Sequence, residues 1–298
     1  MTALYCAVED LSPLEATGSE LARLPNLERL LARATRLRNE PDWRAWAGTA
    51  FGLTAQSPVP VGRTVAASHQ LATDGASWFV ATPVKLVAGI DHVRLDAIGA
   101  LPVESEIRAS LARDHARDFA GAPFSLLATP TGLLLRGPQG LEIDTSDPAP
   151  WAGREVSSAL PRGRDSALLL RHMTELQMWL HARGAAANAL WCWGGAQGNL
   201  PQPVRRPALN SDDEYLNALV RLTSGTASAD SLATYRFAGL GAARDPYSEA
   251  ERRWFAPLAE SVGRGAMAEL WYAGSVYRLS RWQRLRRWRR VVPWWSAA

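Results

Sequence analysis

Residues 174–195 read TELQMWLHARGAAANALWCWGG, and they indicate the fold class more clearly than any other part of the chain. The first eight residues place apolar and polar side chains in the pattern of a helix that packs on a core. Residues 188–195 form a short aromatic run that ends in Gly194 and Gly195. This run predicts a strand and a glycine turn, a unit whose backbone approaches a ligand or another segment closely.

Helix and strand patterns alternate over the rest of the chain. Periodic spacing or a capping pattern predicts helices at 26–38, 103–120, 165–183, after Ser211, and at 248–264 with a kink at Pro257. Short apolar runs predict strands at 77–80, 84–87, 93–95, 190–193 and 269–272, and a hairpin formed by 124–128 and 132–136. Residues 55–76 and 200–211 are expected to be connecting segments, because proline and other loop-forming residues are frequent there.

We therefore expect an α/β protein in which residues 190–193 belong to a central mixed sheet with flanking helices, and α+β is the alternative. Three regions are expected along the chain. They are a helical N-terminal region at 1–57, an α/β body at 58–277 and a basic tail rich in tryptophan and arginine at 278–298.

The composition is that of a globular protein, with 47% hydrophobic and 21% charged residues in 298. Cys6 and Cys192 are too few for a disulfide framework and fit a reducing compartment. The first residues lack the basic segment of a secretory signal, and no apolar run has the length of a membrane span. These features predict a cytoplasmic protein.

The positive charge is concentrated in the tail. Residues 278–298 hold seven arginines and no acid, and without them the formal net charge of +4 becomes −3. Apolar residues recur every three positions in a helix-like pattern that Pro293 ends, at Leu279, Trp282, Leu285 and Trp288. Three alternatives stay open: the tail docks on the body, lies on an anionic membrane surface, or binds nucleic acid.

The helix at 165–183 carries the clearest candidate site. Thr174, Gln177 and His181 share one face, because they are three and four residues apart. They form either a buried polar network, a ligand-facing surface or a solvated face. The candidates for contact with a ligand or partner are Thr174, Glu175, Gln177, His181, Asn188, Trp191, Trp193, Gly194 and Gly195.

Familiar catalytic and metal-binding motifs are missing from the sequence. The five histidines form no zinc-ligand spacing, and only the adjacent pairs Asp91–His92 and Asp114–His115 suggest a contribution to a metal site. The sequence GGAQG at 194–198 is neither a P-loop nor a dinucleotide fingerprint. We therefore expect no cofactor and no metal, and the sequence assigns no catalytic residue.

Several motifs in order resemble the RpfE-type regulatory proteins of proteobacteria. They are SWFVATPVKLVAGIDHVRL at 77–95, TELQMWLH at 174–181, NALWCWGG at 188–195, ERRWFAPL at 251–258 and a Trp/Arg-rich end. The second strand of that family usually reads A-D-P-V-H-L, and here Thr82 and Lys85 replace its acid and its histidine.

NALWCWGG also resembles a segment of the cofactor-independent phosphoglycerate mutases of the alkaline phosphatase superfamily. Those enzymes use two metals held by Asp and His clusters, and this chain has no histidine beyond His181. The resemblances imply a non-catalytic regulatory or interaction protein of mutase-like ancestry, with a protein partner. The alternative is a metal-dependent mutase-like enzyme or phosphohydrolase that acts on a small phosphorylated ligand.

Overall fold

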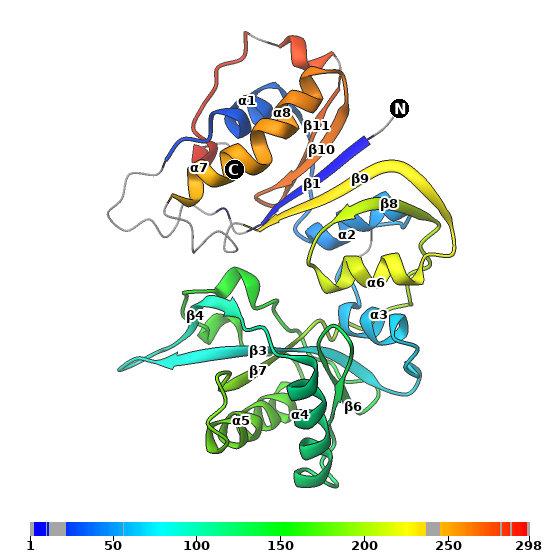
Figure 1. The fold of residues 1–298 in the computed structure, drawn as a ribbon, viewed down its shortest axis with the longest axis vertical. Helices are drawn as coiled ribbons and strands as arrows, with labels where there is room; N and C mark the ends of the chain where they lie inside the picture. The colour runs from blue at the N-terminus through cyan, green and yellow to red at the C-terminus, as the bar shows by residue number, and fades with distance from the viewer. Residues whose placement is uncertain are drawn as a thin grey trace. The chain divides into compact units, whose positions relative to one another are not determined.

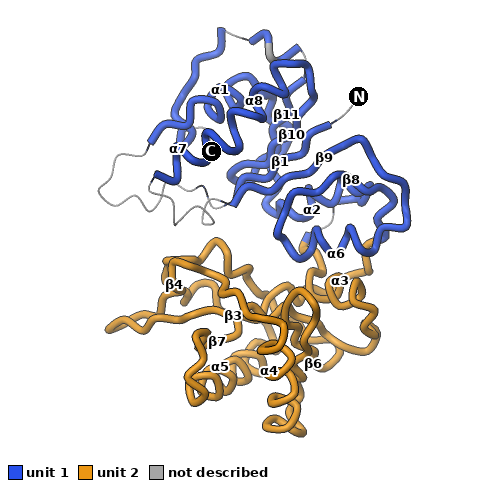
Figure 2. Tube along the Cα trace, in the orientation of Figure 1, with its two compact units in different colours: residues 1–57, 202–298 blue, residues 58–201 orange. Residues whose placement is uncertain are grey.

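The computed structural model describes residues 3–9, 11, 22–55, 57–236, 245–280, 282–286 and 288–296. The chain is an α/β protein that divides into two compact units (Figure 1, Figure 2). Unit 1 comprises Met1–Ser57 and Gln202–Ala298, and unit 2 is the inserted segment Pro58–Pro201. This division differs from the three regions expected from the sequence, because residues 202–277 pack with the N-terminal residues.

Unit 1 is built on a six-stranded mixed sheet in the order β2-β11-β10-β1-β9-β8. β1 is paired in parallel with its two neighbours, β8 pairs in parallel with β9, and β11 is antiparallel to both β10 and β2. The strands are β1 (Ala3–Glu9), β2 (Thr35–Asn39), β8 (Arg205–Asn210), β9 (Thr226–Arg236), β10 (Met267–Tyr272) and β11 (Ser275–Leu279).

Helices cover both faces of this sheet. Alternate residues of β1 such as Cys6 and Val8 join a core with α1 (Pro25–Arg33) and α8 (Ala256–Gly263). Tyr5, between them in sequence, contacts Trp46 of α2 (Trp43–Gly48), which in turn contacts α6 (Glu214–Leu222). The alternation of side chains along one strand therefore supports a helical layer on each side.

Several expectations for unit 1 were wrong in detail. The helix expected at 26–38 ends at Arg33, and the next residues form edge strand β2 against β11. Residues 205–210, expected to be a connector, form β8. The α6 N-cap is Asp213, whose Oδ1 accepts from the Leu216 amide at 3.0 Å, and not Ser211. Serine and aspartate both cap helices, so the sequence alone does not decide which of two such residues, two positions apart, is the N-cap.

The kink expected in the helix at 248–264 takes the form of a π-helical turn. Residues Glu251–Phe255 form that turn, between α7 (Pro246–Ala250) and α8. Pro257 follows this turn inside a continuous helical run from 246 to 263, so it cannot donate the helical hydrogen bond to the preceding turn, and the helix departs from α geometry next to it.

The tail is not the continuous helix that we expected. Leu279 ends β11, and two short 3₁₀ turns follow at Gln283–Leu285 and Trp294–Ser296. Trp294 is fully buried in the core of unit 1, where its indole Nε1 donates to the Ala22 carbonyl at 3.0 Å. The tail therefore docks through Trp294, whereas Trp282 and Trp288 remain exposed.

Unit 2 contains a five-stranded antiparallel sheet around one long strand. β3 (Ser77–Ala88) pairs with β4 (Val93–Ala100), β6 (Leu133–Gly137) and β7 (Ala189–Trp193), and β6 also pairs with β5 (Ser125–Ala128). β3 runs through Pro83, which was expected to separate two strands. The predicted hairpin at 124–136 and the predicted strand at 190–193 are confirmed.

Three α-helices belong to unit 2, together with two 3₁₀ turns at Ala149–Trp151 and Ser157–Ala159. α4 (Ser105–Asp118) and α5 (Ser166–Ala182) confirm the predicted helices, and they contact β5 and β7 respectively. α3 (Val61–Ser68) lies in the segment expected to be a loop. Leu190 and Cys192 of β7 pack with Leu176 of α5 in a single apolar core.

Candidate functional site

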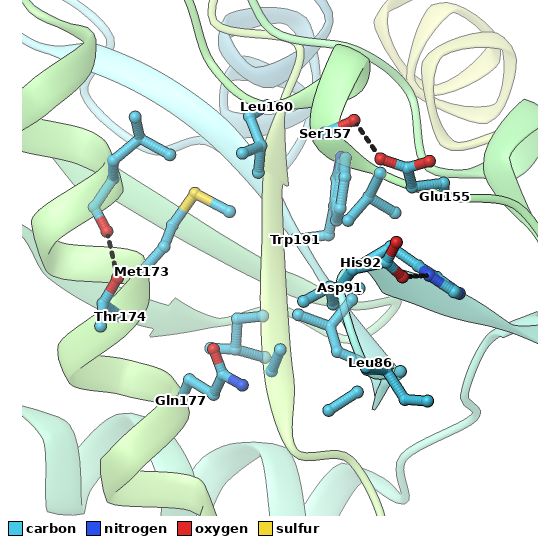
Figure 3. Close-up of a pocket in the computed structure, with 18 residues that line it drawn as sticks. Leu86, Asp91, His92, Glu155, Ser157, Leu160, Met173, Thr174, Gln177 and Trp191 are labelled. Carbon is cyan, nitrogen blue, oxygen red and sulfur yellow. Dashed lines mark hydrogen bonds and ion pairs between the residues drawn. The ribbon is translucent and has the colours of Figure 1, made fainter.

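Unit 2 contains a cavity of about 580 Å³ beside strand β7 (Figure 3). Its volume lies in the range of small-molecule sites. Four segments supply its walls: the end of β3 with the hairpin tip that leads into β4, residues 155–160, helix α5 and β7. Among the described strands β7 pairs only with β3, so the cavity lies where β7 has no second strand beside it.

Helix α5 forms one wall of the cavity. Leu170, Met173, Thr174 and Gln177 line it, and these positions share a helix face because they are three or four residues apart. The Thr174 hydroxyl donates to the Leu170 carbonyl at 2.9 Å, an intrahelical bond that leaves its methyl group available to a ligand. Thr174 and His181 are exposed and Gln177 is half-buried, so these three residues do not form the buried network considered from the sequence.

Trp191 of β7 forms the floor of the cavity. Its indole Nε1 donates to the Ser146 carbonyl at 2.8 Å, which fixes the ring plane and satisfies its only donor. The ring is nearly buried and yet contributes to the lining. Trp191 therefore presents a fixed aromatic surface with no spare hydrogen-bonding group.

Acidic groups face α5 across the cavity (Figure 3). Asp91 Oδ1 lies 2.7 Å from His92 Nδ1, and this hydrogen bond lowers the pKa of the Asp91 carboxyl. Glu155 Oε1 accepts from the Ser157 hydroxyl at 2.6 Å. Lysine and arginine are missing from the described residues that line the cavity, so these carboxylates have no cationic lysine or arginine beside them in the lining.

The segment that carries Glu155 is held to β4 by backbone hydrogen bonds. The Leu95 amide donates to the Arg154 carbonyl at 2.9 Å, and the Val156 amide donates to the Val93 carbonyl at 3.0 Å. These bonds join residues about 60 positions apart in sequence. No local pattern marks residues 155–160 as part of a site, so sequence reasoning missed them.

Of the nine candidate residues, Thr174, Gln177 and Trp191 line the cavity. Asn188 instead extends the pairing of β7 with β3, because its amide side chain exchanges hydrogen bonds with the Leu86 backbone at 2.7 and 2.8 Å. Glu175 pairs with Arg171 at 3.0 Å on the outer surface of α5. His181 is likewise outside the cavity.

The remaining three candidates, Trp193, Gly194 and Gly195, contact other parts of the protein. Trp193 donates from Nε1 to the Thr82 hydroxyl at 2.8 Å. Gly194 has a φ of +74° and its carbonyl accepts from the Gly62 amide at 2.9 Å. A Cβ on Gly195 would overlap the ring of Phe79. The expected close approach at the two glycines is therefore to the protein itself.

Two buried histidines form a second polar cluster in unit 2. His115 Nε2 lies 3.3 Å from His172 Nε2, between the rings of Phe119 and Phe124. His115 Nδ1 accepts from the Leu126 amide at 3.4 Å, so its proton is on Nε2 and is donated to His172. The sequence paired His115 with Asp114, which instead contacts Arg117 at 3.3 Å on the surface.

Among the described residues no group of three or more His, Cys, Asp or Glu is arranged to hold a metal ion. Both cysteines are buried and free, and burial raises the pKa of each thiol to about 12. Within the described part of the chain, none of the helices combines the length and apolar character that crossing a bilayer requires.

Neither a protein-family model nor a curated protein matches the sequence. One solved structure similar to this chain is a cofactor-independent phosphoglycerate mutase from Thermoplasma acidophilum DSM 1728. The two share 14% identity at a TM-score of 0.36, over 94% of this chain and 89% of that one. A TM-score this low carries no functional argument, and membership of the RpfE-type family stays a prediction.

Proposed function

We propose that this chain is a non-catalytic regulatory or interaction protein whose unit 2 binds a small, largely apolar ligand that is neutral or carries one cationic group. The observation that supports this most is the cavity beside β7, which combines a fixed indole with aliphatic walls and two carboxylates. Sites of this kind bind apolar ligands and orient them through a few polar groups.

The charge of the lining favours this class of ligand over a phosphorylated one. Phosphate groups are usually bound by arginine, lysine, a metal or a helix N-terminus. The described lining instead presents Asp91 and Glu155, which repel an anion and attract an ammonium group. The mutase-like or phosphohydrolase alternative therefore receives no support from this cavity.

The hairpin tip supports a role in interaction. Ile90 and Val93 line the cavity and are also exposed on the outside of the hairpin. A ligand in the cavity would thus contact residues that a partner protein also reaches. Such shared contacts allow the ligand and the partner to influence each other. A ligand changes partner binding only if it interacts differently with the partner-bound and the partner-free protein.

The test uses the neutral fluorescent probe N-phenyl-1-naphthylamine with the full chain. Thr174→Trp fills the cavity and is expected to weaken probe binding at least about tenfold, because the new side chain occupies the ligand volume. The matched control is Met178→Trp, an exposed position of the same helix outside the lining. Equal binding by Thr174→Trp and the parent would place the probe elsewhere.

Ligand charge is tested by displacement of the probe with octylamine or octanoate, which have the same chain length. We expect octylamine to compete better, and Glu155→Gln to reduce that preference. Equal competition by both compounds in both proteins would refute the proposed ligand class. Turnover of 3-phosphoglycerate that Mn²⁺ supports and a chelator abolishes would favour the enzyme instead.

A further inference from the structure

Exposed apolar side chains lie along the tail of unit 1 between Trp282 and Val291 and form its outer edge. Four backbone hydrogen bonds join residues three apart: Gln283 to Ser280, Leu285 to Trp282, Arg286 to Gln283 and Arg289 to Arg286, at 3.0 to 3.3 Å. Gln283–Leu285 form a 3₁₀ turn, in which residues three apart, such as Trp282 and Leu285, lie above one another. The backbone leaves this geometry at Arg286, and Trp288 and Val291 follow on the same exposed stretch.

That edge faces solvent and not the core. Trp282 is 68% exposed, Leu285 53% and Trp288 78%, and Val291, three residues further on, is also exposed. We name these four side chains the tail edge. Large apolar side chains gathered at one exposed place usually mark an interaction site.

Polar side chains of the tail hold the segment so that the tail edge stays outward. Gln283 Nε2 and Arg286 donate to the Thr35 hydroxyl at 2.6 and 2.8 Å, and Arg289 donates to the Ala34 carbonyl at 3.2 Å. Trp294, buried in the core, fixes the far end. The segment is therefore anchored by these contacts while Trp282 and Trp288 remain exposed.

The charge around the tail edge is positive. Residues 279–298 contain six arginines and no acid, whereas Arg278 of β11 is paired with Glu269 at 2.6 Å. Arg289 and Arg290 are exposed in the structure, beside Trp288. Tryptophan prefers the polar–apolar boundary of a bilayer, and each basic residue near an anionic surface contributes about 1 kcal/mol.

We infer that the tail edge is a peripheral binding site for an anionic lipid bilayer. Trp282, Leu285 and Trp288 enter the headgroup boundary, and the neighbouring arginines contact lipid phosphates. Single-stranded nucleic acid also binds tryptophan and arginine, but it does so by stacking bases on aromatic rings. The aliphatic side chains of Leu285 and Val291 on the same edge fit acyl chains and offer no stacking surface.

The experiment is co-sedimentation of the full chain with vesicles of phosphatidylcholine alone or mixed with phosphatidylglycerol. We expect binding to the anionic vesicles that is at least about tenfold tighter than to the neutral ones. Removing the tail edge in Trp282→Ser/Leu285→Ser/Trp288→Ser should abolish it. The matched control removes three exposed apolar side chains of unit 2, in Ile98→Ser/Ile107→Ser/Met178→Ser, and should bind like the parent.

A charge test separates lipid binding from nonspecific adsorption. Arg290→Gln should weaken binding to anionic vesicles about fivefold, whereas Arg113→Gln, exposed in unit 2, should leave it unchanged. An unchanged melting temperature shows that each variant is folded. Equal binding to both vesicle types, binding by the tail-edge variant, or tail-dependent binding of an oligonucleotide or of a second copy without vesicle binding would each overturn the inference.

Discussion

Acidification is expected to destabilise unit 2 through the buried histidine pair. His115 and His172 are only 1% and 3% exposed. Burial, followed by the charge of His172, lowers the pKa of His115 to about 4 from its ordinary 6.5. Burial also lowers the pKa of His172, against an opposing effect of Glu175. The fold therefore holds both rings neutral.

The sign of the effect follows from these directions. A histidine with a depressed pKa in the folded state binds fewer protons than it does unfolded, so its stabilising contribution is complete above about pH 6.5 and declines below it. A depression of about 2.5 pKa units corresponds to about 3.4 kcal/mol when fully expressed. About 2 kcal/mol of this should already be lost at about pH 5, from His115 alone.

Urea denaturation of the full chain near pH 7.5 and pH 5 measures this loss, because carboxylates with ordinary unfolded pKa values near 4 contribute little in that interval. His172→Gln keeps an acceptor for the His115 Nε2–H but removes one titrating ring, and should reduce the pH dependence. His181→Gln, an exposed position of the same helix, should retain all of it.

A parent protein equally stable at both pH values would contradict the reasoning, as would a His181→Gln variant that flattens the dependence as much as His172→Gln. Direct titration of the histidine Cε1 protons by NMR provides an independent measure. We expect the His115 ring to remain neutral at about pH 5, because burial and the charge of His172 lower its pKa to about 4.

Five further substitutions test the packing of both units. Arg44→Ala breaks a buried ion pair of 2.7 Å and should cost about 3–5 kcal/mol of unfolding free energy, whereas Arg171→Ala, in an exposed pair, should cost less than about 1 kcal/mol. Gly195→Ala places a methyl group on a buried phenylalanine ring and should cost about 1–3 kcal/mol, measured by thermal unfolding. Trp294→Ala should cost about 3–5 kcal/mol and Trp288→Ala about 0.5 kcal/mol or less, and the reverse order would show that the tail docks through its other tryptophans.

Sequence patterns predicted several elements of unit 2. α4, α5, the hairpin at 124–136 and strand β7 agree with their predicted positions, because helical periodicity and short apolar runs are signals that a local stretch of sequence carries by itself. Strand β2 was predicted as the last part of the helix at 26–38, because the helical spacing of the preceding leucines, with arginines between them, was extended through it. Its pairing with β11, more than 230 residues later in the chain, makes this segment a strand.

The residues that line the cavity also fall into two groups: those that the local sequence identifies and those that only the tertiary fold brings there. Thr174, Gln177 and Trp191 were candidates because each stands out within its own helix or strand. Glu155 has no such distinction, and it reaches the cavity only because backbone bonds hold its segment to β4. A site assembled from several loops therefore needs the tertiary fold, whereas its helical wall is visible in the sequence.

The tail illustrates why a correct spacing still gave an incorrect element. A repeat of three residues equals the 3₁₀ repeat of about 3.0 and is close to the α-helical repeat of about 3.6, so a short run fits both. Leu279 already belongs to β11, which leaves only Trp282, Leu285 and Trp288 for a repeating turn. An α-helix over so few residues lacks the length to form without tertiary contacts. Here those contacts come from Gln283, Arg286 and Arg289, whose polar groups bind residues 34–35. Because polar side chains do the anchoring, the tail edge stays exposed towards a surface outside the protein.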